Sequence, residues 1–220
     1  IIWFGEMFKK KSFFVVFEGV EGCGKSFQAN KLYKNLKKNK IDTILTREPG
    51  GTKSSELIRN LILKDYFTKN NKEKFDKYTD TLLYLAARNE HVKNKIKPAL
   101  LKKKVVVCDR FIDSTIAYQV YGKKVDMKFI NDIHKKILGK IKPNLVFILK
   151  VSTKSSKLRL KKRKSKNRYD NFAQSFYTKA QKSFLKIAKN KKNYYILNSS
   201  SNNNILEKNI FNIVKKYLNI

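Results

Sequence analysis

The chain has 220 residues, 41% of them hydrophobic, and a formal net charge of +34. This length and composition predict one domain over residues 1–220 with a substantial core, in which 1–12 form a flexible N-terminal extension. Because no apolar run reaches the roughly 18 residues of a membrane span, and the N-terminus has no secretory character, we expect no membrane contact and predict a cytoplasmic location.

Five apolar, strand-like runs alternate with segments of helical period. The strands are expected at residues 13–18, 43–46, 105–108, 145–151 and 194–197. Helices are expected at residues 26–39, 54–64, 79–97, 114–121, 126–138, 155–164, 173–188 and 204–218. Pro98 is expected to end or kink the third of these helices. The alternation predicts an α/β fold, a parallel sheet with helices on both faces.

A glycine-rich segment, Gly-Val-Glu-Gly-Cys-Gly-Lys-Ser, follows the first strand and fits the phosphate-loop pattern G-x-x-x-x-G-K-[ST]. Its glycines let backbone N–H groups converge on phosphate oxygens at a helix N-terminus. We expect Lys25 to reach the β- and γ-phosphates of a nucleoside triphosphate and Ser26 to ligate Mg²⁺. The predicted ATP-binding residues are Gly19, Val20, Glu21, Gly22, Cys23, Gly24, Lys25 and Ser26. An ordinary glycine-rich turn is the alternative interpretation.

Charged residues also follow the third strand. Asp109 and Arg110 come directly after it, at the carboxyl end where ligands bind in open α/β sheets. We expect Asp109 to hold Mg²⁺ opposite Ser26 and Arg110 to clamp a phosphate. An ion pair without a ligand is the alternative. Since Arg110 stands where hydrolysing ATPases often carry an acidic residue that activates water, transfer to another acceptor is favoured.

Further candidates lie after the second strand and on the third helix. Arg47 begins the sequence Arg-Glu-Pro-Gly-Gly-Thr, a turn that would aim its side chain inward. Tyr84 and Arg88 lie four residues apart on a helix and so share a face. A flat base could stack on the tyrosine and hydrogen-bond to the arginine, although an aromatic at this spacing is more often part of a core.

Together these motifs resemble those of the bacterial thymidylate kinases. The stretches that carry the resemblance are the phosphate loop at 19–26, Thr-Arg-Glu-Pro-Gly-Gly-Thr at 46–52, Leu-Tyr-Leu-Ala-Ala-Arg at 83–88, Asp-Arg-Phe-Ile-Asp-Ser-Thr-Ile-Ala-Tyr-Gln at 109–119 and Pro-Asn-Leu-Val-Phe-Ile-Leu at 143–149. The resemblance implies the P-loop nucleoside monophosphate kinase fold with a five-stranded parallel sheet. It also implies a homodimer that transfers the γ-phosphoryl of ATP, with Mg²⁺, to dTMP and yields dTDP and ADP.

The resemblance implies roles for individual residues as well. The implied substrate-binding residues are Arg47, Arg59, Tyr84, Arg88, Arg110, Ser114, Tyr118 and Gln119. In that family the aromatic stacks on thymine, the arginine four residues later contacts the base edge, and three other arginines hold the 5′-phosphate. Catalytic roles fall on Lys25 and Asp109, and on Glu21 near the sugar 3′-hydroxyl and the metal. His91 and His134 are interpreted as incidental helix residues, because a phosphate dianion needs no general base.

Members of this family supply the arginine that neutralises the transferring phosphoryl group either from the phosphate loop or from a lid. Residues 20–23 contain no arginine, so the resemblance implies the lid type. The densely basic stretch at about 161–172 is the expected lid, with Arg163 or Arg168 as its catalytic residue. A solvated run of charge is the alternative interpretation. Arg159 is interpreted as a helix-surface residue.

Two other functions remain open. One is a different small kinase, acting on a deoxynucleoside or another monophosphate. The other is a nucleic-acid-binding ATPase, because a strongly basic surface attracts polyanions. The lysines are spread from end to end of the chain, which argues against a specific nucleic-acid partner.

Overall fold

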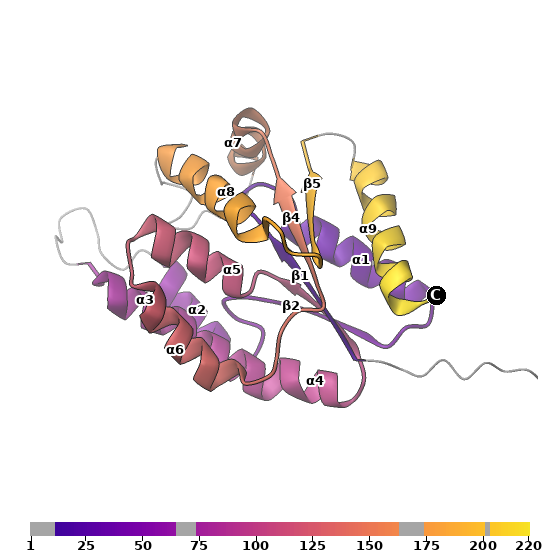
Figure 1. Ribbon diagram of the computed structural model, residues 1–220, viewed down its shortest axis with the longest axis horizontal. Coiled ribbons are helices and arrows are strands. Elements are labelled where there is room, and N and C mark those ends of the chain that lie inside the picture. The colour runs from indigo at the N-terminus through magenta and orange to yellow at the C-terminus, as the bar shows by residue number, and fades with distance from the viewer. Residues whose placement is uncertain (1–11, 65–73, 163–173, 201–202) are drawn as a thin grey trace, which may run out of the picture.

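A computed structural model describes residues 12–64, 74–162, 174–200 and 203–220 (Figure 1). Its sheet has five parallel strands in the order β2-β3-β1-β4-β5. The strands are β1 (Phe13–Glu18), β2 (Thr43–Arg47), β3 (Val105–Asp109), β4 (Leu145–Lys150) and β5 (Tyr194–Asn198). The predicted fold class is confirmed, and every predicted strand boundary agrees to within one residue.

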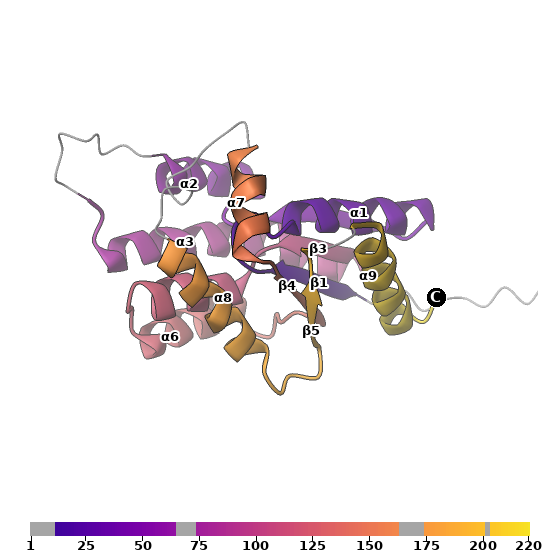
Figure 2. The same cartoon turned by 90° about the horizontal axis from the view of Figure 1, so that it is seen from above.

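Helices cover both faces of the sheet. They are α1 (Lys25–Lys38), α2 (Lys53–Leu63), α3 (Lys77–His91), α4 (Lys97–Leu101), α5 (Ile112–Thr115), α6 (Met127–Leu138), α7 (Thr153–Lys161), α8 (Gln174–Ala188) and α9 (Asn203–Leu218), with π-helical segments at Val92–Ile96 and Ile116–Gly122. Figure 2 shows α1 on one side of the sheet and α8 on the other. All six residues of β1 are buried, because this strand has a neighbour on each side and helices on both faces.

Short side-chain caps set where the helices around the sheet begin. The Thr52 hydroxyl accepts a hydrogen bond from the Ser55 N–H, and the Ser55 hydroxyl accepts one from the Thr52 N–H, so α2 starts directly after the turn that follows β2. The Asp126 carboxylate likewise caps α6. The buried residues of α6 recur every four positions, at Ile130, His134 and Leu138, so this helix turns one face to the interior.

Pro98 does not end the helical path. The chain stays helical from Lys77 to Leu101 and changes to π-helical geometry over Val92–Ile96, just before the proline. Pro98 lacks an N–H group, and its ring would clash with the carbonyl four residues earlier in a regular α-helix. The helical path therefore passes through a wider, π-helical turn just before it reaches the proline.

The parallel register brings three strand ends together. Phe17 of β1 and Arg47 of β2 are both level with Asp109 of β3. Loops that leave these strands therefore meet at one edge of the sheet, where open α/β sheets bind their ligands.

The core makes a direct stability test possible. Leu32 on α1 is 1% exposed and Leu101 on α4 is 73% exposed. We expect Leu32→Ala to lower the free energy of unfolding by about 2–5 kcal/mol, since it leaves a cavity, and Leu101→Ala to change it by less than about 0.5 kcal/mol. Urea unfolding followed by circular dichroism measures both, and equal losses would contradict the packing of α1 on the sheet.

Candidate active site

The phosphate loop has the backbone that its glycines allow. Gly19, Gly22 and Gly24 have φ angles of 138°, 71° and 91°. A Cβ atom on Gly19 would lie 2.7 Å from the Leu149 carbonyl oxygen, so no larger residue fits there. Helix α1 starts directly after the loop, and its first turn has no acidic residue. Its N–H groups and dipole are therefore available to an anion.

Lysine and serine at the end of the loop lie where the sequence predicts them. The Lys25 ammonium, in a side chain that is nearly buried, donates to the Val20 carbonyl over 2.8 Å and lies 3.8 Å from the Glu21 carboxylate. The Ser26 hydroxyl donates to Oδ2 of Asp109. The loop and the end of β3 are thus joined by a serine hydroxyl and a carboxylate. The oxygens of both groups are hard ligands of the kind that Mg²⁺ prefers.

These residues fit a magnesium ion. Among the described residues Oδ1 of Asp109 is buried and has no hydrogen-bond partner, which would be costly if nothing else bound there. The described parts of the chain hold no cluster of three His, Cys, Asp or Glu side chains for a metal. Ser26 and Asp109 would therefore share the ion with phosphate oxygens, as is usual for Mg²⁺.

Arg110 connects the phosphate loop to the next segment. Its φ of 72° is rare for a residue with a side chain and persists only where the surroundings impose it. Here Nη1 donates to the Gly19 carbonyl over 3.0 Å and to the Ser114 hydroxyl over 2.9 Å, and Nη2 donates to the Glu21 carboxylate. The guanidinium also lies 5.3 Å from the centre of the Tyr118 ring. Loop and pocket wall are thereby held in one arrangement.

Glu18 is a buried carboxylate that sequence reasoning missed. Oε1 accepts hydrogen bonds from the Phe111 and Ser114 N–H groups, and Oε2 accepts one from the Ser114 hydroxyl at 2.6 Å. Burial, together with the nearby charge of Asp113, raises the pKa of Glu18 to about 7. An acidic residue at the end of an apolar strand was the available signal. Its contacts fix Ser114, and through it Arg110.

The turn after β2 presents two arginines. Arg47 is half-exposed and pairs with the Glu56 carboxylate at 3.1 Å, while Arg59 donates to the Pro49 carbonyl over 2.6 Å. Glu56 also accepts the Gly51 N–H at 2.9 Å. No motif in the sequence singles out Glu56, whose carboxylate holds both this turn and Arg47.

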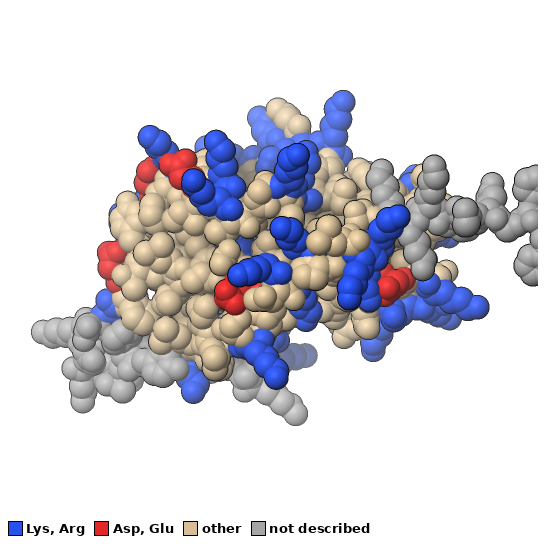
Figure 3. All heavy atoms as spheres, turned by 90° about the horizontal axis from the view of Figure 1, so that it is seen from below, with Lys and Arg blue, Asp and Glu red and all other residues tan. Residues whose placement is uncertain are grey.

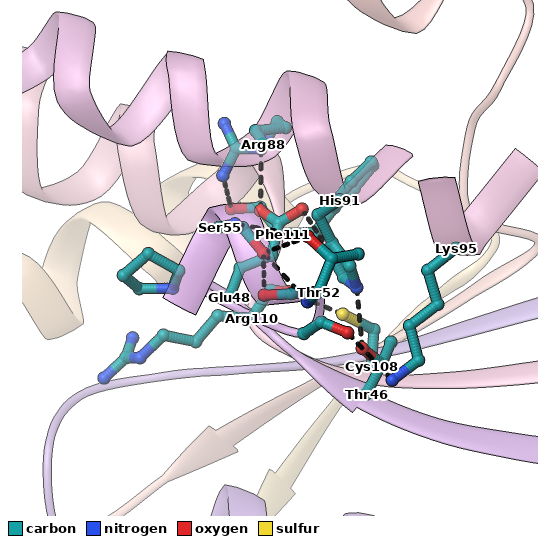
Figure 4. A network of polar contacts seen from close by, with 12 residues as sticks. Thr46, Glu48, Thr52, Ser55, Arg88, His91, Lys95, Cys108, Arg110 and Phe111 are labelled. Atoms are coloured by element: carbon teal, nitrogen blue, oxygen red, sulfur yellow. Dashed lines mark hydrogen bonds and ion pairs between the residues drawn. The ribbon is translucent and has the colours of Figure 1, made fainter. Parts of the chain in front are cut away.

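Arg88 lies in a buried network with Glu48 (Figure 4). Its Nε donates to the carboxylate over 2.7 Å, and His91 Nδ1 donates to the other carboxylate oxygen over 3.0 Å. Burial would raise the pKa of Glu48, but the charge of Arg88 and the hydrogen bond from His91 outweigh it and lower the pKa. His134 contacts Arg88 as well, at 2.7 Å. The interpretation of both histidines as incidental is therefore wrong.

These groups surround one cavity of about 540 Å³. The predicted site residues that line it are Glu21, Gly22, Gly24, Lys25, Ser26, Arg47, Arg59, Tyr84, Arg88, Asp109, Arg110, Ser114, Tyr118 and Gln119. Val20 and Cys23 are buried within the loop, so they can offer a phosphate only main-chain groups. Arg163 and Arg168 lie outside the described residues, as do residues 1–11 of the predicted extension.

Arg159 also lines the cavity. Its Nη1 donates to the Gly22 carbonyl over 3.3 Å and its Nη2 to the Ser199 carbonyl over 2.6 Å. It joins α7 to the phosphate loop, so its interpretation as a helix-surface residue is wrong. The contact spans 137 residues of sequence, and no local pattern announces it.

Comparison with known proteins identifies the family. A family model described as thymidylate kinase matches residues 17–210. The chain is 44% identical over 180 residues to a thymidylate kinase of Wolbachia sp. subsp. Brugia malayi, covering 80% of this chain and 82% of the relative. It is 38% identical over 208 residues to that of Wolbachia pipientis subsp. Culex pipiens, covering 92% and 96%.

A solved structure agrees with these sequence matches. The crystal structure of thymidylate kinase from Ehrlichia chaffeensis superimposes with a TM-score of 0.72 at 30% identity, over 93% of this chain and 99% of that one. The family model covers most of the chain, and the fold is the one that the motifs predict. The chain belongs to the thymidylate kinase family.

Proposed function

We propose that this protein transfers the γ-phosphoryl group of ATP to the 5′-phosphate of dTMP. The observation that carries the proposal is one cavity lined by two kinds of residues. The phosphate loop with Lys25 and Asp109 lines it, and so do Tyr84 and Arg88. Arg110 lines the same cavity and is bonded to the loop. Two phosphorylated molecules can thus meet with their phosphates facing each other.

Positioning and charge carry out the reaction. The loop N–H groups, the N-terminus of α1 and Lys25 would hold the donor phosphates. Mg²⁺, held between Ser26 and Asp109, would neutralise charge on the β- and γ-phosphate oxygens when bound. On the acceptor side Arg47, Arg59 and Arg110 would bind the dTMP phosphate. Because this phosphate is already an anion, no general base is required.

The base would lie between Tyr84 and polar groups. The Tyr84 ring offers a stacking surface, and Arg88 and Gln119 offer N–H donors. Within the described residues Nε2 of Gln119 is buried without a hydrogen-bond partner, so a substrate oxygen would relieve its burial cost. Ser114 and Tyr118 line the same side, and Ser114 is held by Glu18.

The lid remains a proposal. Arg159 and Leu160, near the end of α7, line the cavity, so the chain reaches the basic stretch from the rim of the site. Phosphoryl transfer requires positive charge over the γ-phosphate and exclusion of water, and the phosphate loop supplies no arginine. We therefore assign this charge to Arg163 or Arg168.

Charge distribution does not favour a nucleic-acid function. Figure 3 shows lysine and arginine side chains scattered over one face of the molecule. In the described residues no helix is both long and apolar enough to cross a membrane. We propose that the protein works in the cytoplasm, where both nucleotide substrates occur.

The acceptor is tested with purified protein, ATP and Mg²⁺, offered dTMP, dUMP, dCMP, dGMP or thymidine. We expect the highest kcat/KM with dTMP, a loss of roughly 10- to 200-fold with dUMP because one methyl group discriminates modestly, and no turnover after chelation of the metal. A coupled assay that follows the release of ADP measures the rate with each acceptor and after chelation. Faster turnover of another acceptor, or ATP hydrolysis stimulated by nucleic acid, would overturn the proposal.

The lid is tested by Arg163→Lys and Arg168→Lys, made separately. We expect the catalytic position to lose at least about tenfold in kcat with little change in dTMP affinity, because an ammonium cannot replace a planar guanidinium on the γ-phosphate. Lys161→Arg, which exchanges the two cationic groups at a neighbouring position and also keeps the charge, serves as the control and should leave kcat unchanged. Normal kcat in both arginine variants would show that the lid assignment is wrong.

We also propose a homodimer that uses α2 and α3. Leu57 and Leu61, one turn apart on α2, are 72% and 38% exposed, and Leu82 on the adjoining α3 is 47% exposed. Large apolar side chains that stay exposed on adjacent helices favour association.

Light scattering should give twice the chain mass for the native protein and a single chain mass for Leu57→Asp. Leu101→Asp, equally exposed on α4, should stay dimeric; a monomeric native protein would refute the proposal.

A further inference from the structure

Arg88 donates nearly all of its hydrogen bonds to the protein itself. A guanidinium has five N–H groups. Nε donates to Glu48, the two Nη1 hydrogens go to Thr115 at 2.8 Å and to His134 at 2.7 Å, and one Nη2 hydrogen goes to the Phe111 carbonyl at 2.8 Å. Among the described residues this leaves one Nη2 hydrogen for the cavity that Arg88 lines.

His134 can take part in this arrangement only as an acceptor. Arginine is always protonated and has no acceptor atom, so Nε2 of His134 must carry the lone pair and Nδ1 the proton. The histidine is 7% exposed, and burial together with the charge of Arg88 lowers its pKa to about 3. Its ring therefore stays neutral throughout the pH range in which the enzyme would work.

The position of His134 shows that it acts through Arg88. It lies on α6, which contributes no residue to the lining of the cavity. Its contact with Arg88 bridges 46 residues and holds the outer end of the guanidinium, while Glu48 holds the inner end. A charge-assisted hydrogen bond of this kind fixes orientation more than a neutral one.

We propose that His134 is a positioning residue for base selectivity: it holds the Arg88 guanidinium so that a single, fixed N–H faces the base. This rests on the proposed function of the cavity. A fixed donor matches a carbonyl oxygen, such as O4 of thymine, and opposes the exocyclic amino group that cytosine carries at the same place. A guanidinium that was free to turn would lose the hydrogen bond to the thymine oxygen and would avoid the clash of donors with the cytosine amino group.

Kinetics of His134→Leu and His134→Gln test the proposal. Leucine removes the acceptor, whereas the amide oxygen of glutamine restores one. For His134→Leu we expect a rise of about tenfold in KM for dTMP, less than about threefold change in kcat, and a fall of about tenfold in the preference for dTMP over dCMP. His134→Gln should recover most of both, and Lys135→Gln, an exposed neighbour, should match the native enzyme.

A second measurement needs no substrate. The chain has two histidines, so long-range ¹H–¹⁵N spectra of the native protein contain two ring systems, and the one lost in His134→Gln is assigned. We expect its Nε2 to be unprotonated and its Nδ1 to carry the proton from pH 5.5 to 8. A proton on Nε2 would overturn the inference, as would unchanged selectivity in a folded His134→Leu variant. If the native enzyme instead prefers another acceptor, the proposed function fails while the spectrum still decides the hydrogen bond.

Discussion

The buried ion pair between Glu48 and Arg88 is the interaction on which the proposed acceptor side of the site depends. A pair taken out of water is stable only where further hydrogen bonds satisfy both partners, and removal of one partner typically costs roughly 3–5 kcal/mol. Here His91 binds the second carboxylate oxygen, and the Glu48 N–H donates to the Asp109 carbonyl over 2.9 Å. The turn after β2 is thereby tied both to α3 and to the end of β3.

A second charged group plays the same part where the phosphate loop meets the end of β3. Arg110, in a strained backbone conformation, bonds the Gly19 carbonyl and the Glu21 carboxylate, and Glu18 fixes it through Ser114. The two networks share the short segment that follows β3, since Phe111 gives its N–H to Glu18 and its carbonyl to Arg88. Preorganised charges of this kind act without reorganisation during the reaction, which is the main source of catalysis in phosphoryl transfer.

Much of the fold could be predicted because its signals are local. The strands are continuous apolar runs, and β1, β3 and β4 are almost entirely buried, so the bounds of all five could be predicted to within one residue. The π-helical segments at Val92–Ile96 and Ile116–Gly122 were missed, because a changed period over five to seven residues is invisible in the pattern of apolar positions. The site residues that follow β1, β2 and β3 could be predicted because each comes directly after an apolar run whose end marks the carboxyl end of a strand.

The sequence by itself determined the succession of strands and helices along the chain, the phosphate loop and the motif residues that line the cavity. Glycine spacing, apolar runs and strand ends are properties of neighbouring residues and can be recognised without the fold. Only the tertiary structure decided the partners. His91, His134 and Arg159 look like ordinary helix residues, and their roles depend on contacts with residues 43, 46 and 137 positions away. Burial turns these distant polar groups into obligatory partners, since each must satisfy the others once water is excluded.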